Sequence, residues 1–307
     1  MQGPISDRPW CDLNKSRSRA GDDVQARMSV AGRLVAPGVA AVAVFFSCLG
    51  IMAYYSFLPS LGIAKVGTGF TLVNYEAFLG DAFNLSYLWR SLRVATYTTA
   101  IVLLMGYTIA YFMSFCSKRM RTIISVVLLV QFFTSYVVRT YAIVLVLGRY
   151  GIVNETLQAL GITEAPIKLL FNEFAVALGI VLVAVPFMVF PIYSSIASIP
   201  PNLLTAAESL GATRFKIFTE VILPMSMPGV AAGVVIVYLF NFTSFITPSL
   251  LGGGYFDMIA NLIYDQAMNT QQYPVAAATS MIALVLTILI VYAMQKAFAT
   301  MIRGTER

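Results

Sequence analysis

Six long apolar stretches, separated by polar segments, run through this 307-residue chain. Each is long enough to cross a bilayer, since about 20 apolar residues span the hydrocarbon core. Hydrophobic residues make up 59% of the chain and charged residues 11%, whereas soluble domains are roughly half apolar and a quarter charged. Backbone polar groups inside lipid must be paired within helices. The sequence therefore predicts an all-α membrane protein with six transmembrane helices at residues 34–57, 93–115, 123–147, 174–196, 224–251 and 275–298.

Basic residues are distributed unevenly between the predicted loops. Fourteen Lys and Arg side chains lie before the first span, after the second and fourth spans, or at the C-terminal end, against five in the opposite loops. Cytoplasmic loops are enriched in Lys and Arg, so both termini of this multi-pass protein are predicted to be cytoplasmic. Residues 1–33 and 300–307 would then be cytoplasmic tails of a transmembrane domain at residues 34–299. The net charge of +6 follows from this asymmetry and requires no nucleic-acid partner.

Several kinds of catalytic chemistry have no residues to support them. The chain contains no histidine, and no predicted span contains a carboxylate. The three cysteines are scattered without metal-ligand spacing, and there is no G-x-x-x-x-G-K-[ST] loop to bind ATP phosphates. We therefore expect neither enzymatic activity nor a metal or cofactor in this chain. If ATP drives its function, another polypeptide must bind ATP and Mg²⁺.

The polar segment at about residues 200–222 is too long for a simple turn between two spans. Pro200 and Pro201 suit a helix start, and a helix from there places Leu203, Ala207 and Leu210 on one face. Gly211 then suits the end of this helix, and a second helical turn follows with Phe215, Phe218 and Ile222 on one side. Such a segment either rests on lipid headgroups or docks to another protein.

Part of this segment resembles the EAA motif of the permease subunits of bacterial ABC importers. The matching residues are Ala206, Ala207, Glu208 and Gly211, followed by Ile222-Leu223-Pro224. The resemblance implies the six-helix, type I (MetI-like) importer fold and a cytoplasmic segment that docks into an ATPase. It would place Glu208 in polar contacts with that ATPase, with Arg214 and Lys216 in the same docking segment.

Further stretches resemble one branch of this family, the spermidine/putrescine importers. They are residues 185–193, 247–253 and 273–278, together with Gly106-Tyr107 and Ala110-Tyr111. The resemblance implies a polyamine as solute and a second, homologous permease subunit, which we expect to be a different chain. It also implies two copies of an ABC ATPase and a periplasmic solute-binding protein as partners.

The chain departs from the polyamine branch at two positions. Relatives in that branch typically place acidic residues at the positions of Ser244 and Ser249, where this chain has hydroxyls. An amino-acid derivative, an opine-like conjugate or an aminophosphonate is therefore an alternative solute. A receptor or scaffold subunit that passes no solute is a further alternative.

The fifth predicted span carries a polar stripe that is costly to expose to lipid. It should face either a partner helix or an aqueous path, and we favour the solute path. In the following outer loop, two acids either attract a polycation or the binding protein, or belong to an ordinary solvated loop. The predicted pathway residues are Tyr238, Asn241, Phe242, Thr243, Ser244, Thr247, Asp257 and Asp265.

Other intramembrane residues have predicted structural roles. Pro186 and Pro191 should kink the fourth span, with packing and gating both open as reasons. Gly229 and Gly233 form a G-x-x-x-G pair that predicts close helix contact, either within the subunit or between two permeases. Arg139 should face protein and pair with a carbonyl or an acid.

Overall fold

The computed structural model describes residues 37–305, and the predicted tail at residues 1–33 lies outside this range. The chain divides into two units, Met1–Tyr55 and Ser56–Arg307. The described part of the first unit belongs to the apolar helix Pro37–Ser56, which is long enough to span a membrane. The second unit contains the remaining elements and is described below by itself.

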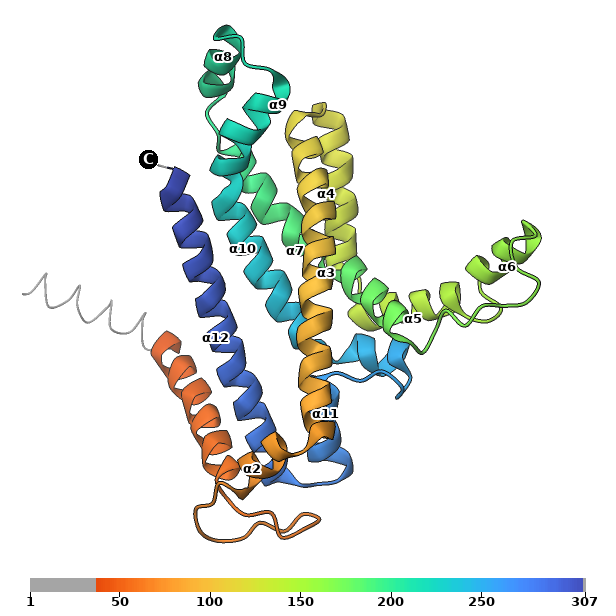
Figure 1. The fold of residues 1–307 in the computed structure, drawn as a ribbon, viewed down its shortest axis with the longest axis vertical. Coiled ribbons are helices and arrows are strands. Elements are labelled where there is room, and N and C mark those ends of the chain that lie inside the picture. Colours follow the sequence, from red (N-terminus) through yellow and green to blue (C-terminus); the bar gives the residue numbers. More distant parts are fainter. Residues whose placement is uncertain (1–36, 306–307) are drawn as a thin grey trace, which may run out of the picture. The chain divides into compact units, whose positions relative to one another are not determined.

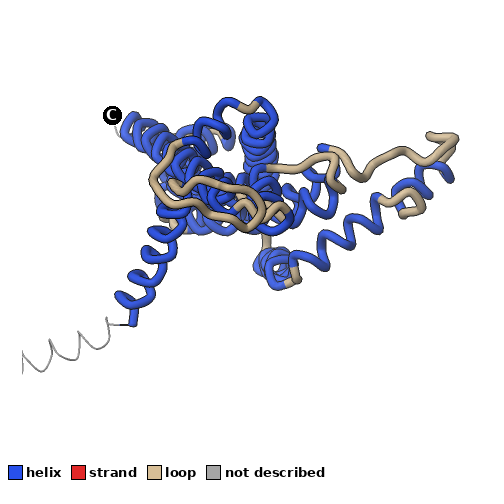
Figure 2. Tube along the Cα trace, turned by 90° about the horizontal axis from the view of Figure 1, so that it is seen from below, coloured by secondary structure: helices blue, strands red, loops and turns tan. Residues whose placement is uncertain are grey.

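The described residues are helical apart from loops and one isolated β-bridge between Ser60 and Val66, as Figure 2 illustrates. Six helices in this part of the chain are long and apolar enough to cross a membrane. This confirms the predicted all-α class and number of spans, although several boundaries differ. The six helices are Pro37–Ser56, Ala82–Phe115, Tyr136–Ala159, Glu173–Ala197, Arg214–Phe242 and Tyr273–Met301.

The second unit has two ends that we name after helices, the α8 end and the α11 end (Figure 1). The α8 end also carries the start of α4 and the end of α12, whereas the α11 end carries α2 and the start of α3. The elements in chain order are α2 Val73–Gly80, α3 Ala82–Phe115, α4 Lys118–Phe133, α5 Tyr136–Leu147, α6 Ile152–Ala159, α7 Glu173–Ala197, α8 Pro201–Ser209, α9 Arg214–Ile217, the π-helix η1 Phe218–Ile222, α10 Leu223–Phe242, the π-helix η2 Pro248–Gly252, α11 Ile259–Tyr264, the π-helix η3 Asp265–Asn269 and α12 Tyr273–Thr305.

Helices α3, α7 and α10 form the core, and glycines let them approach closely. The fully buried Met188 of α7 lies between Gly106 of α3 and Gly233 of α10. A Cβ at Gly229 would lie 2.5 Å from the backbone oxygen of Pro191, so this position has no room for a larger residue. The G-x-x-x-G pair of α10 therefore packs against α7 within the subunit, one of the two arrangements that the sequence allowed.

The third predicted span is not one helix. Residues 123–147 divide into α4 and α5, with Thr134 extended and Ser135 also outside the helical conformation between them. Arg139 lies in the first turns of α5, and its Nη2 donates to the carbonyls of Gln131 and Thr134. These are carbonyls at the end of α4 that have no helical partner, so Arg139 pairs with carbonyls as predicted.

The fifth predicted span also has different limits. It begins at Arg214 as a continuous helix, in which η1 directly precedes Pro224, and it ends at Phe242 instead of residue 251. Pro224 lacks the N–H that a regular α-helix needs, and the wider π-turn before it accommodates this defect. Pro224 therefore lies inside the helix and does not begin it.

Two other spans are longer than predicted. Helix α3 begins at Ala82, where the Asp81 carboxylate accepts a hydrogen bond from the backbone N–H of Phe83 at 2.9 Å. Its outer turns carry Arg93, whose Nη2 lies 2.5 Å from Oε2 of Glu173 at the start of α7. Helix α12 continues to Thr305, so residues 300–305 extend a helix where a tail was predicted. Both helices therefore reach beyond their apolar stretches.

Helix α7 continues through both of its prolines. Because Pro186 has no N–H, the carbonyl of Leu182 loses its helical partner, and the side-chain amide of Gln131 on α4 donates to it instead. Pro191 presents its carbonyl to Gly229 of α10. Both prolines thus take part in contacts between helices, which is the packing role that the sequence left open.

Candidate functional site: a projecting segment and an acidic cavity

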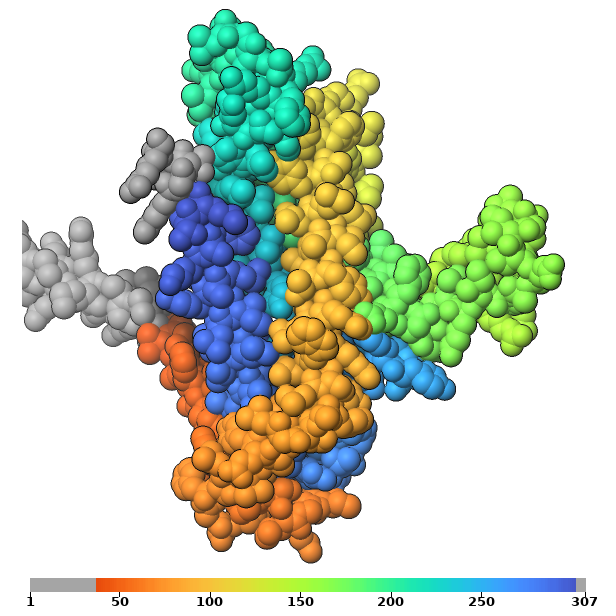
Figure 3. Space-filling view, viewed as in Figure 1, coloured from red at the N-terminus to blue at the C-terminus, as the bar shows by residue number. Residues whose placement is uncertain are grey.

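The segment from α8 to α9 projects beyond the ends of α4 and α12 (Figures 1 and 3). Pro201 occupies the first turn of α8, and Gly211 ends this helix with a φ of +77°, a conformation that few residues other than glycine adopt. Thr213 then caps α9 by accepting a hydrogen bond from the N–H of Lys216 at 3.3 Å. The two predicted short helices and the turn at Gly211 are therefore present. We name α8 and α9 with their connection the coupling segment.

The apolar side of the coupling segment differs in part from the prediction. Leu204 and Ala207 pack against the core, as does Ala212 in the connection between the helices. Of the predicted stripe, Ala207 thus packs against the subunit's own core, whereas Leu203 is 45% and Leu210 88% exposed and both are free to contact a partner.

The second helical turn likewise has both buried and exposed apolar side chains. Ile222 is buried and Phe218 packs against the rings of Tyr107 and Tyr111, as a shared apolar side predicts. Phe215, however, is 76% exposed. With Leu203 and Leu210, this makes three large apolar side chains on the exposed surface of the coupling segment.

Charged side chains surround these exposed apolar groups. Glu208, Arg214 and Lys216 are all exposed, and so is Ala206 of the motif. Lys216 Nζ lies 4.0 Å from Glu220 Oε2, a solvent-exposed pair that contributes little to stability. A projecting surface of apolar and charged groups is suited to docking against another protein.

The polar residues of α10 itself do not line an open path. Asn241 is fully buried, and its Nδ2 donates to Thr98 Oγ1 at 3.0 Å and Thr99 Oγ1 at 3.2 Å on α3. Tyr238 is 8% and Phe242 1% exposed, both within the apolar core. In this structure these three residues contact other helices of the subunit, which is one of the two arrangements that the sequence left open, and their place in a solute path stays a prediction.

Of the polar residues after α10, some are buried and one is exposed. Ser244 and Thr247 are buried, and the Tyr136 hydroxyl lies 3.2 Å from Ser244 Oγ and within hydrogen-bonding distance of Thr247 Oγ1. These two hydroxyls therefore join the break after α10 to α5, and their place in a solute path stays a prediction. Thr243 is exposed, with its hydroxyl bonded to the Leu239 carbonyl.

The two predicted acids of the outer loop lie together on a cavity of about 500 Å³ at the α11 end. Residues 252–272, predicted as a loop, contain α11 and η3, and these helices bring Asp257 and Asp265 to one wall. Four aromatic rings and several amides and hydroxyls form the rest. We name this the acidic cavity; it is lined by Phe83, Tyr87, Phe245, Ser249, Gly254, Asp257, Asn261, Leu262, Tyr264, Asp265 and Asn269.

The acidic cavity holds negative charge that is only partly compensated. Burial raises the pKa of Asp257, and the nearby carboxylate of Asp265 raises it further, while Arg90 lowers it. The Arg90 guanidinium lies over the rings of Tyr87 and Phe256, at 5.7 and 5.8 Å from their centroids. Among residues 37–305, neither acid forms a salt bridge. A cation entering the cavity would therefore supply missing counter-charge.

Polar groups of the cavity are held in place by α11. Asn261 Nδ2 donates to Ser249 Oγ at 2.7 Å, and its Oδ1 accepts from the N–H of Met258. Asn269 Nδ2 donates to Asp265 Oδ1 at 2.8 Å. Asn261, Ser249 and the four aromatic rings were not predicted as cavity residues, because they come from α3, the break after α10, η2 and α11, which only the fold brings together.

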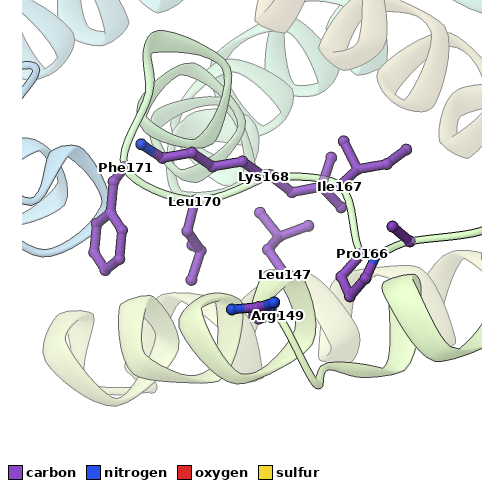
Figure 4. A pocket seen from close by; sticks show the side chains of 9 residues that line it. Leu147, Arg149, Pro166, Ile167, Lys168, Leu170 and Phe171 are labelled. Carbon is purple, nitrogen blue, oxygen red and sulfur yellow. The ribbon is translucent and has the colours of Figure 1, made fainter.

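A second cavity, of about 400 Å³, has the opposite charge (Figure 4). Apolar residues form most of its wall, and Arg149 and Lys168 are its charged residues. Lys168 Nζ lies 5.1 Å from the centroid of the Tyr255 ring. We name it the basic cavity; it would repel a cationic solute. Among the described residues, no group of three or more His, Cys, Asp or Glu side chains could hold a metal ion.

Comparison with known proteins matches most of this chain to one family. The family model for the binding-protein-dependent transport system inner membrane component matches residues 102–304. The chain is 35% identical over 250 residues to the spermidine/putrescine transport system permease protein PotB of Salmonella typhimurium (strain SL1344). That alignment covers 77% of this chain and 86% of the relative.

Solved structures of importers have the same fold. A bacterial ABC transporter involved in the import of the acidic polysaccharide alginate aligns with a TM-score of 0.78 and 19% identity, over 92% of this chain and 99% of the other. A MetNI methionine ABC transporter aligns with a TM-score of 0.52 and 18% identity, over 73% of this chain and 96% of the other. The type I (MetI-like) fold predicted from the sequence is thereby confirmed.

Proposed function

Because the chain belongs to the family of binding-protein-dependent transport system inner membrane components, we propose that it forms half of the import pathway for a polyamine such as spermidine or putrescine. Membership itself makes the chain a permease subunit, whose relatives are not enzymes. The proposal concerns the solute, the partners and the orientation in the membrane.

The observation that carries the solute class is the acidic cavity. Asp257 and Asp265, which form no salt bridge within residues 37–305, share it with four aromatic rings. Carboxylates attract ammonium groups, and aromatic faces attract cations at close range. A polyamine combines ammonium groups with apolar methylene segments, so it matches both kinds of wall. The name of the relative PotB agrees with this chemistry.

The partners follow from the two ends of the second unit. The coupling segment exposes Leu203, Leu210 and Phe215 beside Glu208, which suits docking to an ABC ATPase that binds ATP and Mg²⁺. Two ATPase copies and a second permease, a different but homologous chain, would complete the membrane complex. A periplasmic solute-binding protein would deliver the solute to the α11 end.

The orientation places the α8 end and both termini in the cytoplasm of the inner membrane. Lys118, Arg119 and Arg121 at the start of α4 lie at the α8 end together with the coupling segment. The acids of the acidic cavity lie at the opposite end. This distribution of charge agrees with the enrichment of cytoplasmic loops in basic residues.

The alternative solute is a zwitterionic amino-acid derivative, opine or aminophosphonate. The observation that favours it is Ser249, a hydroxyl on the cavity wall where polyamine relatives typically carry an acid. Arg90 near Asp257 would then pair with the anionic group of the solute. A scaffold subunit without transport is the remaining alternative.

The test is uptake by proteoliposomes that contain this chain, its sister permease and the ATPase, with the binding protein added outside. Labelled putrescine and spermidine should accumulate only with ATP inside, and an excess of an unlabelled aminophosphonate should not compete. Competition by the aminophosphonate with no polyamine uptake would replace the polyamine by a zwitterion. Stimulated ATP hydrolysis without uptake of any of these solutes would favour the scaffold.

A further inference from the structure

Three irregular points of the fold lie side by side in the second unit. They are the break between α4 and α5, Pro186 in α7, and the break after α10. The ring centroid of Phe187 on α7 lies 5.2 Å from that of Phe132 on α4 and 5.2 Å from that of Phe240 on α10. The ring centroid of Tyr136 on α5 lies 6.0 Å from that of Phe240. Four helices therefore meet at one level, and the regular hydrogen bonding of three is interrupted there.

Gln131 joins α4 to α7 at this level. Its Nε2 donates to the Leu182 carbonyl, which is free because Pro186 has no N–H. An amide on one helix thus completes the backbone bonding of another. Since few other donors exist among apolar side chains, the contact fixes the position of α4 along α7.

Arg139 joins α5 to α4. Its Nη2 donates to the carbonyls of Gln131 and Thr134, across the break between the two helices. Its Nε is buried and has no hydrogen-bond partner among the described residues. A buried donor of a charged group is costly to leave unpaired, so this angle between α4 and α5 does not satisfy the guanidinium fully. The Arg139 guanidinium would therefore favour a different angle between α4 and α5 in which its Nε also has a hydrogen-bond partner.

We propose that Gln131 and Arg139 are positioning residues of a joint whose angle changes during transport. The inference rests on the proposed function, because the driving motion would come from an ATPase bound to the coupling segment. Helix α7 leads directly into α8, and α9 continues into α10, so both helices carry motion from that segment to the joint.

The far side of the joint reaches the acidic cavity. Tyr136, three residues before Arg139, bonds to Ser244 and Thr247 in the break after α10. The same break supplies Phe245 to the wall of the acidic cavity, and η2, which follows it directly, supplies Ser249. A change of the angle between α4 and α5 would therefore move residues next to the cavity, and the joint would link ATP hydrolysis to solute access.

The test uses the full transporter with spin labels on α4 and α5. Cys11, Cys48 and Cys116 are first replaced by serine, and labels are attached after Ile123→Cys and Leu145→Cys, two exposed positions. The distance between the labels is measured without nucleotide and after trapping with ATP and vanadate. Solute imported per ATP hydrolysed is measured on the same preparations.

Four variants are compared with the wild-type residues. Gln131→Met removes the amide donor of the joint, and Arg139→Gln replaces the guanidinium by a shorter neutral amide. If Arg139→Gln does not assemble, Arg139→Lys keeps the charge but removes the Nε donor and the planar fork that reaches two carbonyls. Thr140→Val is the control, because this buried hydroxyl bonds to the Tyr136 carbonyl within its own helix. The wild type and the control should change the label distance on trapping. The joint variants should lose that change and import roughly tenfold less solute per ATP.

Other outcomes would overturn the inference. In one such outcome, Gln131→Met and the Arg139 variant that assembles both keep the wild-type distance change and the wild-type import per ATP. This result would show that Gln131 and Arg139 do not set the angle between α4 and α5. An equal loss in Thr140→Val would point to general loosening of α5. A wild-type complex that imports no solute would remove the proposed function, whereas normal import with unaffected joint variants would remove only the joint.

Discussion

The two ends of α10 use polar residues in opposite ways. At the α8 end the helix runs through η1 into the coupling segment, where Glu208 and Arg214 face solvent. At the other end the helix stops at Phe242, and Ser244 and Thr247 turn inward to bond Tyr136. One end thus exposes its charged side chains, and at the other end the polar side chains are buried in contacts between helices. Polar residues in a membrane protein therefore indicate function only when their exposure is known.

The largest effect should come from reversing a charge on the exposed surface. Glu208→Lys should reduce solute-stimulated ATP hydrolysis by more than about a hundredfold, because a like charge at a docking interface costs several kcal/mol. The subunit should still insert and assemble with its sister permease, since Glu208 is exposed. Hydrolysis by the purified complex is the measurement, with Glu155→Lys on the exposed side of α6 as control. Normal stimulation in Glu208→Lys would exclude the docking role.

A smaller effect is expected at the cavity. Asp257→Asn with Asp265→Asn should raise the KM for spermidine uptake at least about tenfold, because a contact with a charged group contributes about 1.5 kcal/mol or more. The rate at saturating solute should change less, since the coupling segment is intact. Glu164→Gln, an exposed acid outside this cavity, should leave KM unchanged. Equal KM values in the wild type, the double variant and Glu164→Gln would show that the acidic cavity is not part of the solute path.

The contrast between buried and cavity-lining hydroxyls can be sharpened with two serines. Ser249→Asp should add a third carboxylate to the acidic cavity and favour spermidine over putrescine by about fivefold, within the range of one charged contact. Ser244→Asp should instead lower the amount of folded protein, because it buries a charge beside Tyr136. Competition between the two polyamines during uptake measures the first effect, and thermal stability measures the second. An unchanged preference in Ser249→Asp would remove this residue from solute recognition.

The smallest effect concerns pH. Burial raises the pKa of Asp257, so its ionisation is less favourable in the folded protein than in the unfolded chain. The carboxyl therefore contributes most at low pH, and this contribution is lost as pH rises through the folded pKa. Asp257→Asn should raise the melting temperature at pH 7 by less than about 2 °C, and the difference should vanish below pH about 4. An equal difference at both pH values would contradict the role of ionisation.

The sequence predicts the coupling segment well because its signals are local. Proline, a helix-forming run and Gly211 define two short helices without reference to the rest of the fold. The exposure of Leu203 and Leu210 was not predictable, because an apolar stripe does not state whether it faces its own subunit or a partner. The docking interpretation came from the resemblance of the motif.

The breaks within the third and fifth spans were not predictable for a related reason. Apolar residues continue on both sides of Thr134 and beyond Phe242, so hydropathy shows one span where the chain changes direction. The π-helices η2 and η3 also leave no periodic signal of their own. The acidic cavity collects residues from α3, the break after α10, and the region of α11 and η3, and this gathering depends on the tertiary fold.

The missing side chain at Gly229 has a mechanical consequence. Since the Pro191 carbonyl of α7 occupies the space that a Cβ would need, the two backbones are in direct contact with no compressible layer between them. A force on either α7 or α10 would be transmitted to the other helix, because no side chain between them can change its rotamer. Helices α7 and α10 would therefore tilt together as one rigid unit. A force on the coupling segment, which connects them, would act on both helices at the same time.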